Sequence, residues 1–411
     1  MVDQRRIDNQ RSRLDARAAA SRLGVDVRTL YAYAARGLVR SYPGGQGRKH
    51  VYEREDIERL LARKQARSGH GAVAAGALRF GEPVLDSAIT ALTPAGIRYC
   101  GHGLDALLSA QVPYERVAEL LWTGALPTET TPMRAAALPW SRIDAVLPER
   151  ATVLPRLGAI AAVLAADSGR AEKEPLAAAR TIIATLAIGL AGRDPARARQ
   201  ALRGSSLAAS VALALGRDPR PELVDAIDVA LVVSADHELN ASTFAVRVAA
   251  STGASLAACV ATGLQVMTGP RHGGASRLLE DWLRRAGPAA RVAAHLREHL
   301  RRGESVPGFG HPLYPAGDPR AVALLARAAR LRSRGARWRG VQALVEAMAR
   351  NDHDAPNLDA GLVALGAALS LPLGTVGGLF ALGRCAGWIA HALEQRAAGF
   401  LLRPRARYVG A

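Results

Sequence analysis

The apolar and polar positions divide the chain into a short front segment and a long helical body. From about Ala77 onward, apolar residues recur at helical spacing between breaks at Pro and Gly, without the regular alternation typical of strands. Residues 248–270 and 360–383 contain no charge, which raises the question of membrane spans. Both stretches contain Gly with Ser or Thr, and Pro372 breaks the second, so we expect buried core helices. The pattern predicts an all-α body.

The front segment, residues 14–64, has the pattern of a helix-turn-helix. Asp15 and Asp26 are the predicted N-caps of two helices that a turn containing Gly24 separates. Four residues of the second helix are expected on its inward face, at i, i+3, i+4 and i+7: Val27, Leu30, Tyr31 and Ala34. The residues expected to point outward are Arg28, Thr29, Ala32, Tyr33 and Arg36.

A hairpin is predicted next, over residues 39–51. Its tip is rich in glycine and basic residues and lies between two β-prone arms. Residues 53–66 then form an acidic-to-basic helix that suits the helix dipole. The order helix, turn, helix, wing, helix resembles the DNA-binding head of MerR-type regulators. The resemblance implies a winged helix-turn-helix domain at residues 1–67, and residues 68–77 are short, small and polar enough for a linker.

This resemblance implies specific contacts with DNA. Arg28, Thr29 and Tyr33 would lie near base edges in the major groove, and Arg48 and Lys49 of the wing would contact phosphates. A small helical cap with a solvated basic face is the alternative. Because phosphate contacts are salt-sensitive, a single head would bind weakly, and DNA binding would require a dimer.

The distribution of charge changes this picture more than its total does. The formal net charge is +18, from 54 Lys and Arg against 36 Asp and Glu. Residues 1–68 hold 16 basic and 8 acidic residues, so nearly half of the excess lies in about a sixth of the chain. Positive charge at the front fits a polyanion partner. An Arg- and Ala-rich composition explains the remainder equally well.

The cysteines and the start of the chain favour a cytoplasmic protein. The three cysteines, Cys100, Cys259 and Cys385, lack the paired spacing of a zinc site or a redox dithiol. The first residues, from Met1 on, lack the apolar core of a signal peptide. We therefore expect no metal, no membrane partner and a reducing environment.

Five polar clusters interrupt the apolar body, where an ionisable group must be paired or used. They are residues 234–242, residues 269–275, residues 306–320, residues 356–359, and Arg384 together with Arg403-Pro404-Arg405. Singly, each has a structural explanation. A histidine beside glycines is usually a loop residue, Asp359 could cap a helix, and Arg384 could be an interior ion-pair partner.

In this order, the clusters resemble the citrate synthase family over residues 78–411. The matching motifs are Ala-Asp-His-Glu with Asn-Ala-Ser, Gly-Pro-x-His-Gly-Gly-Ala, Gly-Phe-Gly-His with Asp-Pro-Arg, Asn-x-Asp, Arg-x-x-Gly-Trp-x-Ala-His, and Arg-Pro-Arg-x-x-Tyr-x-Gly. The resemblance implies a large helical domain with a small helical domain inserted at about 275–360. The small domain would close over the substrates and exclude water from the thioester.

The implied reaction is the condensation of acetyl-CoA with oxaloacetate to citrate and CoA, a step of the tricarboxylic acid cycle. The family's motif assigns Asp359 as the base that removes a carbon-bound proton. His272 would hydrogen-bond the thioester oxygen, and His311 would donate to the ketone oxygen of oxaloacetate. No cofactor would be bound permanently, because acyl-CoA is a substrate.

Binding residues follow from the same resemblance. His237, Arg320, Arg384 and Arg403 would hold the two carboxylates of oxaloacetate, since Arg forks match carboxylates. In the family, the last arginine reaches the neighbouring subunit, so a homodimer with shared sites is expected. The loop against the adenine end of CoA would consist of Val306, Pro307, Gly308, Phe309 and Gly310.

Departures from the family pattern leave the substrate and direction open. Pro312-Leu313-Tyr314-Pro315 stands where many citrate synthases have Arg-Val-Tyr, and Ser276 replaces a usual Asn. Propionyl-CoA, giving 2-methylcitrate, is an alternative to acetyl-CoA, and citryl-CoA cleavage is an alternative reaction. A third hypothesis is a DNA-binding regulator whose body senses a metabolite. The presence of all three predicted acid-base residues weighs against it.

Overall fold

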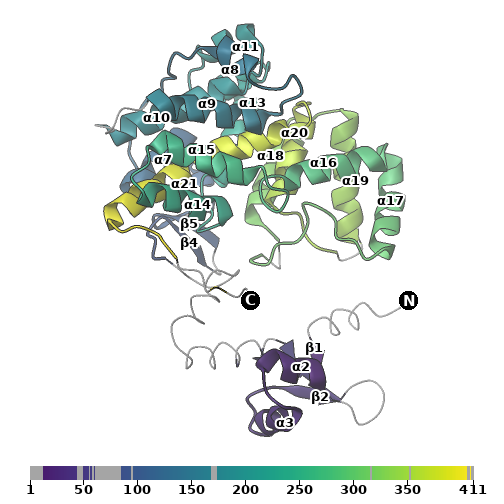
Figure 1. The fold of residues 1–411 in the computed structure, drawn as a ribbon. Helices are drawn as coiled ribbons and strands as arrows, with labels where there is room; N and C mark the ends of the chain where they lie inside the picture. Colours follow the sequence, from purple (N-terminus) through teal and green to yellow (C-terminus); the bar gives the residue numbers. More distant parts are fainter. Residues whose placement is uncertain are drawn as a thin grey trace. The chain divides into compact units, whose positions relative to one another are not determined.

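The computed structural model describes residues 13–43, 50–54, 56–57, 60, 85–93, 96–167, 174–314, 317–350, 353–404 and 408. The chain divides into two compact units, Met1–Asp86 and Ser87–Ala411 (Figure 1). The predicted linker at residues 68–77 lies outside the described residues. Each unit has its own hydrophobic core.

In the front unit, the helix-turn-helix forms as the sequence predicts. Helices α2 (Ala16–Leu23) and α3 (Val27–Ala35) begin after Asp15 and Asp26, whose carboxylates accept backbone N–H groups three residues on, at 2.8 and 2.7 Å. Gly24 ends α2 with φ +60°, a left-handed conformation that glycine adopts without strain. The capping prediction is therefore confirmed.

The predicted hairpin is part of a three-stranded antiparallel sheet. The strands are β1 (Arg13–Asp15), β2 (Ser41–Pro43) and β3 (His50–Glu53), in the order β1-β3-β2. Its tip, with Arg48 and Lys49, lies outside the described residues. The core of the unit comprises Ala19, Ala20, Leu23, Leu30, Val39, Tyr52 and Ile57.

Two tyrosines of α3 do not lie on the faces that the sequence predicts. Leu30 is fully buried as expected, but Tyr31 is 53% exposed. Tyr33, expected outside, instead packs against the core. Helical spacing alone does not show which side of a helix the rest of its unit covers.

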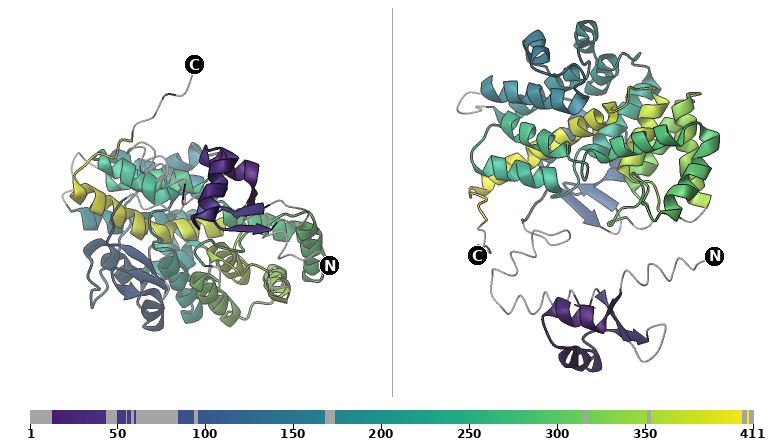
Figure 2. Two further views of the ribbon diagram at one scale, coloured as in Figure 1. Left: turned by 90° about the horizontal axis from the view of Figure 1, so that it is seen from below. Right: turned by 45° about the vertical axis from the view of Figure 1, so that its right-hand side comes forward.

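The body is helical, as predicted (Figure 2). Its first ten helices are α6 (Leu104–Ser109), α7 (Tyr114–Thr123), α8 (Trp140–Ala145), α9 (Val153–Asp167), α10 (Pro175–Gly189), α11 (Pro195–Ala201), α12 (Leu207–Ala214), α13 (Pro221–Ser234), α14 (Ala241–Ser251) and α15 (Leu256–Met267). The remaining six are α16 (Ala275–Ala286), α17 (Ala289–Arg301), α18 (Pro319–Arg330), α19 (Ala336–Arg350), α20 (Leu358–Ala368) and α21 (Thr375–Ala398).

A small antiparallel sheet, which the sequence pattern did not indicate, begins the body. It consists of β4 (Thr90–Thr93), β5 (Gly96–Tyr99) and β6 (His102–Gly103), in chain order. The strands are too short for two-residue alternation to stand out. The sheet matters because Thr90 and Tyr99 reach the turn after α13.

Helix α21 is the central element of the core. It packs against α7, α9, α13, α14 and α15. It is long and apolar enough to cross a membrane, but 94% of its most apolar window is buried inside the protein. Together with α20, it accounts for the uncharged stretch at residues 360–383, and the two helices separate around Pro372. The expectation of core helices is confirmed.

Helices α16 to α19 fall within the predicted inserted region at about 275–360, and α20, which begins at its end and extends beyond it, joins them in one connected group. Helix α20 packs against α16, α18 and α19, and α17 packs against α19 (Figure 1). Helix α18 also contacts α13, and α20 contacts α21. These two contacts join the group to the helices around α21.

We predict that Gly387→Ala lowers the free energy of unfolding by about 1–3 kcal/mol. An added Cβ would collide with the Asp236 carboxylate and with the backbone oxygen of Ala235, whose position a hydrogen bond from Gly387 N–H fixes at 2.9 Å. Gly340→Ala in α19 is the control, since its Cβ meets no atom within 4 Å. That change should raise stability by about 0.5–1 kcal/mol. Urea unfolding midpoints measure both, and equal effects would contradict the packing argument.

Candidate active site

The turn between α13 and α14 is built around a buried carboxylate. Asp236 is fully buried and accepts hydrogen bonds from Thr90 Oγ1 at 2.6 Å and from the N–H of Glu238 at 3.1 Å. The Tyr99 hydroxyl, which has one proton to donate, lies 3.1 Å from both the Val232 and the Asp236 backbone oxygens. These contacts fix the backbone on either side of His237.

His237, His311 and Tyr314 form a cluster of rings. His237 Nε2 lies 2.6 Å from the Tyr314 hydroxyl, and the centroids of the His237 and His311 rings are 5.6 Å apart. The guanidinium of Arg320 lies over the Tyr314 ring at 5.4 Å. Burial, and then the charges of Arg320 and Arg384, lower the pKa of His237 well below its usual value. The cluster is therefore neutral near pH 7.

The hydrogen bonds of His311 determine which of its nitrogens carries the proton. The backbone N–H of Leu313 donates to Nδ1 at 3.2 Å. Burial and the Arg320 charge lower the pKa of His311, so the ring is neutral and carries its proton on Nε2. His311 can therefore donate one hydrogen bond from Nε2 to a bound oxygen.

Two buried arginines lie at the centre of this region. Arg320 donates from Nε and Nη2 to the carboxylate of Asp318, at 2.9 and 2.8 Å, and Asp318 also accepts the N–H of Leu358 at 3.0 Å. Arg384 donates to the backbone oxygen of Ser234 at 2.7 Å and lies 5.1 Å from the Phe380 ring. Both guanidinium groups keep donors that no acceptor among the described residues occupies, which suits a dianionic ligand.

His272 is held by a serine that the sequence analysis did not single out. Its Nε2 lies 2.7 Å from Ser242 Oγ, which also accepts from Trp388 Nε1 at 3.1 Å. Ser242 Oγ is 2.8 Å from Asn240 Oδ1, so its one proton goes either to Asn240 or to His272. Donation to His272 leaves the imidazole proton on Nδ1, from which it can reach a ligand.

The electrostatic surroundings of His272 keep it neutral. Burial, and then the charge of Arg384, lower its pKa to about 4. The ring also stacks edge-on against Phe380 at 6.4 Å, in the same helix as Arg384. His272 can therefore act as a neutral hydrogen-bond donor throughout the physiological range.

Asp359 lies in the first turn of α20. Asn357 caps this helix by accepting the N–H of Asp359 at 3.0 Å, and Ser276 Oγ donates to the Asp359 carboxylate. Burial raises the pKa of Asp359, while the Ser276 hydrogen bond and the Arg320 charge lower it. A raised pKa makes the carboxylate a stronger base. Ser276 was noticed only as a departure from a motif.

The loop at residues 306–310 is fastened to the start of α20. Gly308 accepts the N–H of Asn357 at 2.9 Å, and Gly310 donates to Ala355 at 2.8 Å. The φ angles of Gly308 and Gly310 are +83° and +76°, which other residues rarely adopt. Val306, Gly308 and Phe309 are buried, whereas Pro307 and Gly310 are half-buried.

Arg403 is the predicted body-site residue that the structure does not bring to the others. It is exposed and follows α21, in a segment that the Leu402 N–H fastens to Ser251 Oγ at 3.1 Å. The other four predicted residues, His237, His272, His311 and Asp359, lie close enough to the buried Arg320 or Arg384 for these charges to shift their pKa. Tyr314 belongs to this group, and only its position after His311 could have indicated it.

In the front unit, the predicted DNA-contacting residues differ in exposure. Arg28 is exposed, Thr29 is half-buried, and Tyr33 packs against the core. The exposed ring on this helix is Tyr31. Tyr31 is therefore the residue that the helical-face argument missed.

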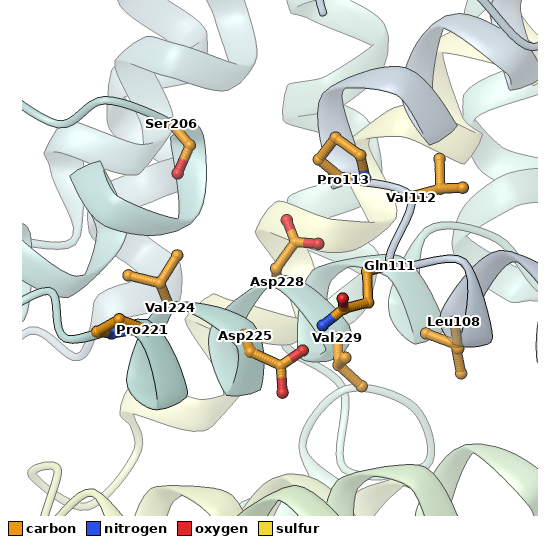
Figure 3. Close-up of a pocket in the computed structure, with 10 residues that line it drawn as sticks. All are labelled: Leu108, Gln111, Val112, Pro113, Ser206, Pro221, Val224, Asp225, Asp228 and Val229. Carbon is orange, nitrogen blue, oxygen red and sulfur yellow. The ribbon is translucent and has the colours of Figure 1, made fainter. Parts of the chain in front are cut away.

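Two cavities lie outside this arrangement. One of about 310 Å³, between α6–α7 and α12–α13, contains the carboxylates of Asp225 and Asp228 and none of the predicted site residues (Figure 3). Burial, with Glu115 and Asp225 nearby, raises the pKa of Asp228 to about 7. The other, of about 220 Å³, lies beside Gly273 and Gly274, directly after His272.

Among the described residues, no group of three His, Cys, Asp or Glu side chains is arranged for a metal ion.

Comparison with known proteins gives consistent results for both units. The family model for the citrate synthase C-terminal domain matches residues 79–405, and a helix-turn-helix domain model matches residues 13–65. The chain is 35% identical over 329 residues to putative citrate synthase 2 of Mycobacterium tuberculosis, covering 76% of this chain and 87% of that protein. It is 30% identical to citrate synthase of Haloferax volcanii (76% and 89% covered) and 29% identical to 2-methylcitrate synthase of M. tuberculosis (74% and 82%).

Solved structures show the same fold for the body. Citrate synthase of Thermoplasma acidophilum, solved as a ternary complex with carboxymethyl coenzyme A and oxaloacetate, aligns with a TM-score of 0.72 at 24% identity, covering 82% of this chain and 96% of that one. The enzyme of Thermotoga maritima aligns with a TM-score of 0.67 at 25% identity, covering 80% and 94%.

We predict that Arg384→Gln raises the pKa of His272 from about 4 toward 6.5. Removing a neighbouring positive charge favours the imidazolium, while burial still keeps the pKa below 6.5. NMR titration of labelled histidine side chains measures the shift. Arg350→Gln is the control, because Arg350 is exposed and pairs with Glu346. An unchanged or lower pKa in Arg384→Gln would refute the assigned cause.

Proposed function

Because the chain belongs to the citrate synthase family, we propose that it condenses acetyl-CoA or propionyl-CoA with oxaloacetate, releasing CoA and citrate or 2-methylcitrate. The observation that supports this most directly is the gathering of two neutral histidines and a buried carboxylate around Arg320 and Arg384. A proton donor for each carbonyl oxygen and a base for the carbon acid are what the reaction needs.

Asp359 takes a proton from the acyl carbon next to the thioester. The electron pair moves toward the thioester oxygen, which His272 stabilises by donating from Nδ1. Ser242, 2.7 Å from Nε2, sets this tautomer when its hydroxyl donates to His272 rather than to Asn240. No full negative charge then has to develop on the oxygen, which lowers the barrier at a weakly acidic carbon.

The carbon then attacks the ketone of oxaloacetate. A bond forms between the acyl carbon and the ketone carbon, and His311 gives its Nε2 proton to the ketone oxygen as that oxygen becomes a hydroxyl. The backbone N–H of Leu313 supports this role by donating to Nδ1, which leaves the ring proton on Nε2. Water subsequently hydrolyses the thioester of the condensed product and releases CoA.

Arg320 and Arg384 bind the carboxylates of oxaloacetate, with His237 beside them. Asp318 occupies one edge of the Arg320 fork and leaves the other edge for the ligand. Arg403 completes the site from the neighbouring subunit of a homodimer. Its exposed position after α21 is consistent with that role.

The loop at residues 306–310 binds the adenine end of CoA through its backbone. Pro307 and Gly310 are the half-buried residues of the loop, and the buried residues Val306, Gly308 and Phe309 support it from within. His299 holds its base, since Nε2 lies 3.1 Å from the Ser305 oxygen and Nδ1 lies 2.8 Å from the Glu304 carboxylate. We place this reaction in the cytoplasm.

Three assays of the full-length protein test the proposal. CoA release is measured with oxaloacetate plus acetyl-CoA, and then with oxaloacetate plus propionyl-CoA; citryl-CoA cleavage is scored separately. We expect condensation with at least one acyl-CoA. Turnover of citryl-CoA alone would instead support the lyase alternative. A folded dimer without activity in all three assays would contradict the enzyme proposal.

The roles of Asp359 and Arg384 predict different kinetic defects. Asp359→Ala should abolish condensation but leave oxaloacetate binding within a few-fold, because the arginines hold the acceptor. Arg384→Leu should raise the oxaloacetate KM sharply. Calorimetric titration with oxaloacetate separates binding from turnover, and equal loss of binding in both variants would contradict these assignments.

DNA binding by the front unit is a second candidate function. The capped helix-turn-helix and its hairpin support it, and Arg28, Thr29, Tyr33 and the wing residues Arg48 and Lys49 would make the contacts. Tyr31, exposed on the same helix, adds a candidate. Fluorescence anisotropy should show preference for the gene's own upstream DNA over random DNA at physiological salt. Equal affinity for both would exclude a specific operator.

A further inference from the structure

The turn that joins α18 to α19 carries a dense group of arginines. Residues 330–339, which we name the arginine turn, contain no Asp or Glu. Its five arginines are all exposed: Arg330, Arg332, Arg334, Arg337 and Arg339. Trp338 of the same segment is buried and anchors it to the protein. Half of the turn's residues therefore present guanidinium groups to solvent.

These arginines differ from the other exposed arginines nearby in having no carboxylate partner. In the same helical group, Arg301 pairs with Glu298 at 2.8 Å, and Arg302 pairs with Glu304 at 3.1 Å. Throughout the described chain, no ion pair involves an arginine of the turn. The charge of Arg337 acts on the carboxylate of Glu280, which is buried and accepts the N–H of Gly374 at 2.7 Å.

Backbone carbonyls hold some of these side chains in place instead. Arg337 donates to the Leu371 oxygen, and Arg339 donates to the Arg334 oxygen. Arg217, at the end of α12, donates to the neighbouring Ser370 oxygen at 2.6 Å and adds a sixth guanidinium. A carbonyl orients a guanidinium without neutralising it. The surface is therefore both ordered and strongly positive.

The arginine turn is separate from the candidate active site. Gly335 faces the Ala367 oxygen at the last turn of α20, whereas Asp359 is in the first turn. Eight residues of helix place these two points about 12 Å apart. The loop at residues 306–310 contacts the start of α20 as well. A ligand at the arginine turn would therefore not need to enter the proposed acyl-CoA site.

We propose that the arginine turn is a contact surface for the phosphate backbone of nucleic acid. Arginine forks match phosphate oxygens, and bound phosphates relieve the mutual repulsion of guanidinium groups without partners. Nucleic acid is favoured over other polyanions because the same chain carries a helix-turn-helix unit. The proposal extends the DNA-binding role proposed for that unit by giving the body a contact of its own.

The test uses the full-length protein and short random-sequence duplex DNA, with anisotropy measured over a range of salt concentrations. We expect the triple variant Arg332→Gln, Arg334→Gln, Arg339→Gln to reduce the slope of log K against log salt by about 1 to 3, since each lost phosphate contact removes about 0.9. Affinity at low salt should fall at least tenfold. An unchanged slope overturns the proposal.

A matched variant controls for net charge. The triple variant Arg142→Gln, Arg199→Gln, Arg203→Gln removes an equal number of positive charges from exposed positions elsewhere on the body. It should leave the slope unchanged. An equal effect of both triple variants would show a general charge effect and overturn the local assignment. Melting temperature and turnover should match the parent protein in both, because neither set touches the candidate active site.

To separate the contribution of the front unit to binding, Arg28→Ala is added to the parent protein and to each triple variant. If the arginine turn contributes, the triple variant weakens binding further in this background. If Arg28→Ala alone removes all binding, the front unit is sufficient and the proposal fails, while DNA binding by that unit stands. Vesicles containing phosphatidylserine and polyglutamate are the competing polyanions. If the protein bound the vesicles or polyglutamate as tightly as DNA, and the triple variant weakened that binding equally, the assignment to nucleic acid would be overturned.

Discussion

The guanidinium groups of Arg320 and Arg384 are buried within reach of each other's charge, and the chemistry of the site depends on keeping them there. Each has a different hydrogen-bond acceptor. Arg320 donates to the carboxylate of Asp318, and Arg384 donates to the Ser234 carbonyl, with the charge of Asp236 nearby. Burial, and then the charge of one or both of these arginines, lower the pKa of the three site histidines. The charges that suit a dianionic acceptor therefore add to the effect of burial in keeping the histidines neutral and able to donate.

Buried contacts extend this arrangement into the core. The Asp236 carboxylate lies 3.4 Å from His391 Nε2, and His391 Nδ1 is 3.2 Å from the fully buried Arg247. Arg247 in turn pairs with Glu394, which accepts the N–H of Ala88 at 2.8 Å. Helices α14 and α21 and the first residues of the body thus support one side of the site. Substitutions in this network are expected to act on the site through backbone position rather than through direct contact.

The arginine turn and the front unit would give one chain two surfaces of the same electrostatic character. The condensation reaction proposed for the body requires neither of these surfaces. If both contact nucleic acid, the salt dependence of binding would come from more phosphates than a helix-turn-helix alone can reach, and affinity would rise without any change at the acyl-CoA site. The separation of about 12 Å along α20 would let binding and turnover proceed at the same time.

The sequence alone determined the helical body and the two caps of the helix-turn-helix, and its motifs singled out His237, His272, His311, Arg320, Asp359 and Arg384 as the residues that we propose for the site. Each rests on a local signal: a capping carboxylate, an uncharged helix, or a short motif in fixed order. Tertiary structure decided the rest. Ser242, Ser276 and Tyr314 contact partners distant in sequence, and Thr90 and Tyr99 join the short strands after residue 89 to the buried turn at Asp236. Such contacts are set by three-dimensional packing, which leaves no periodic trace along the chain.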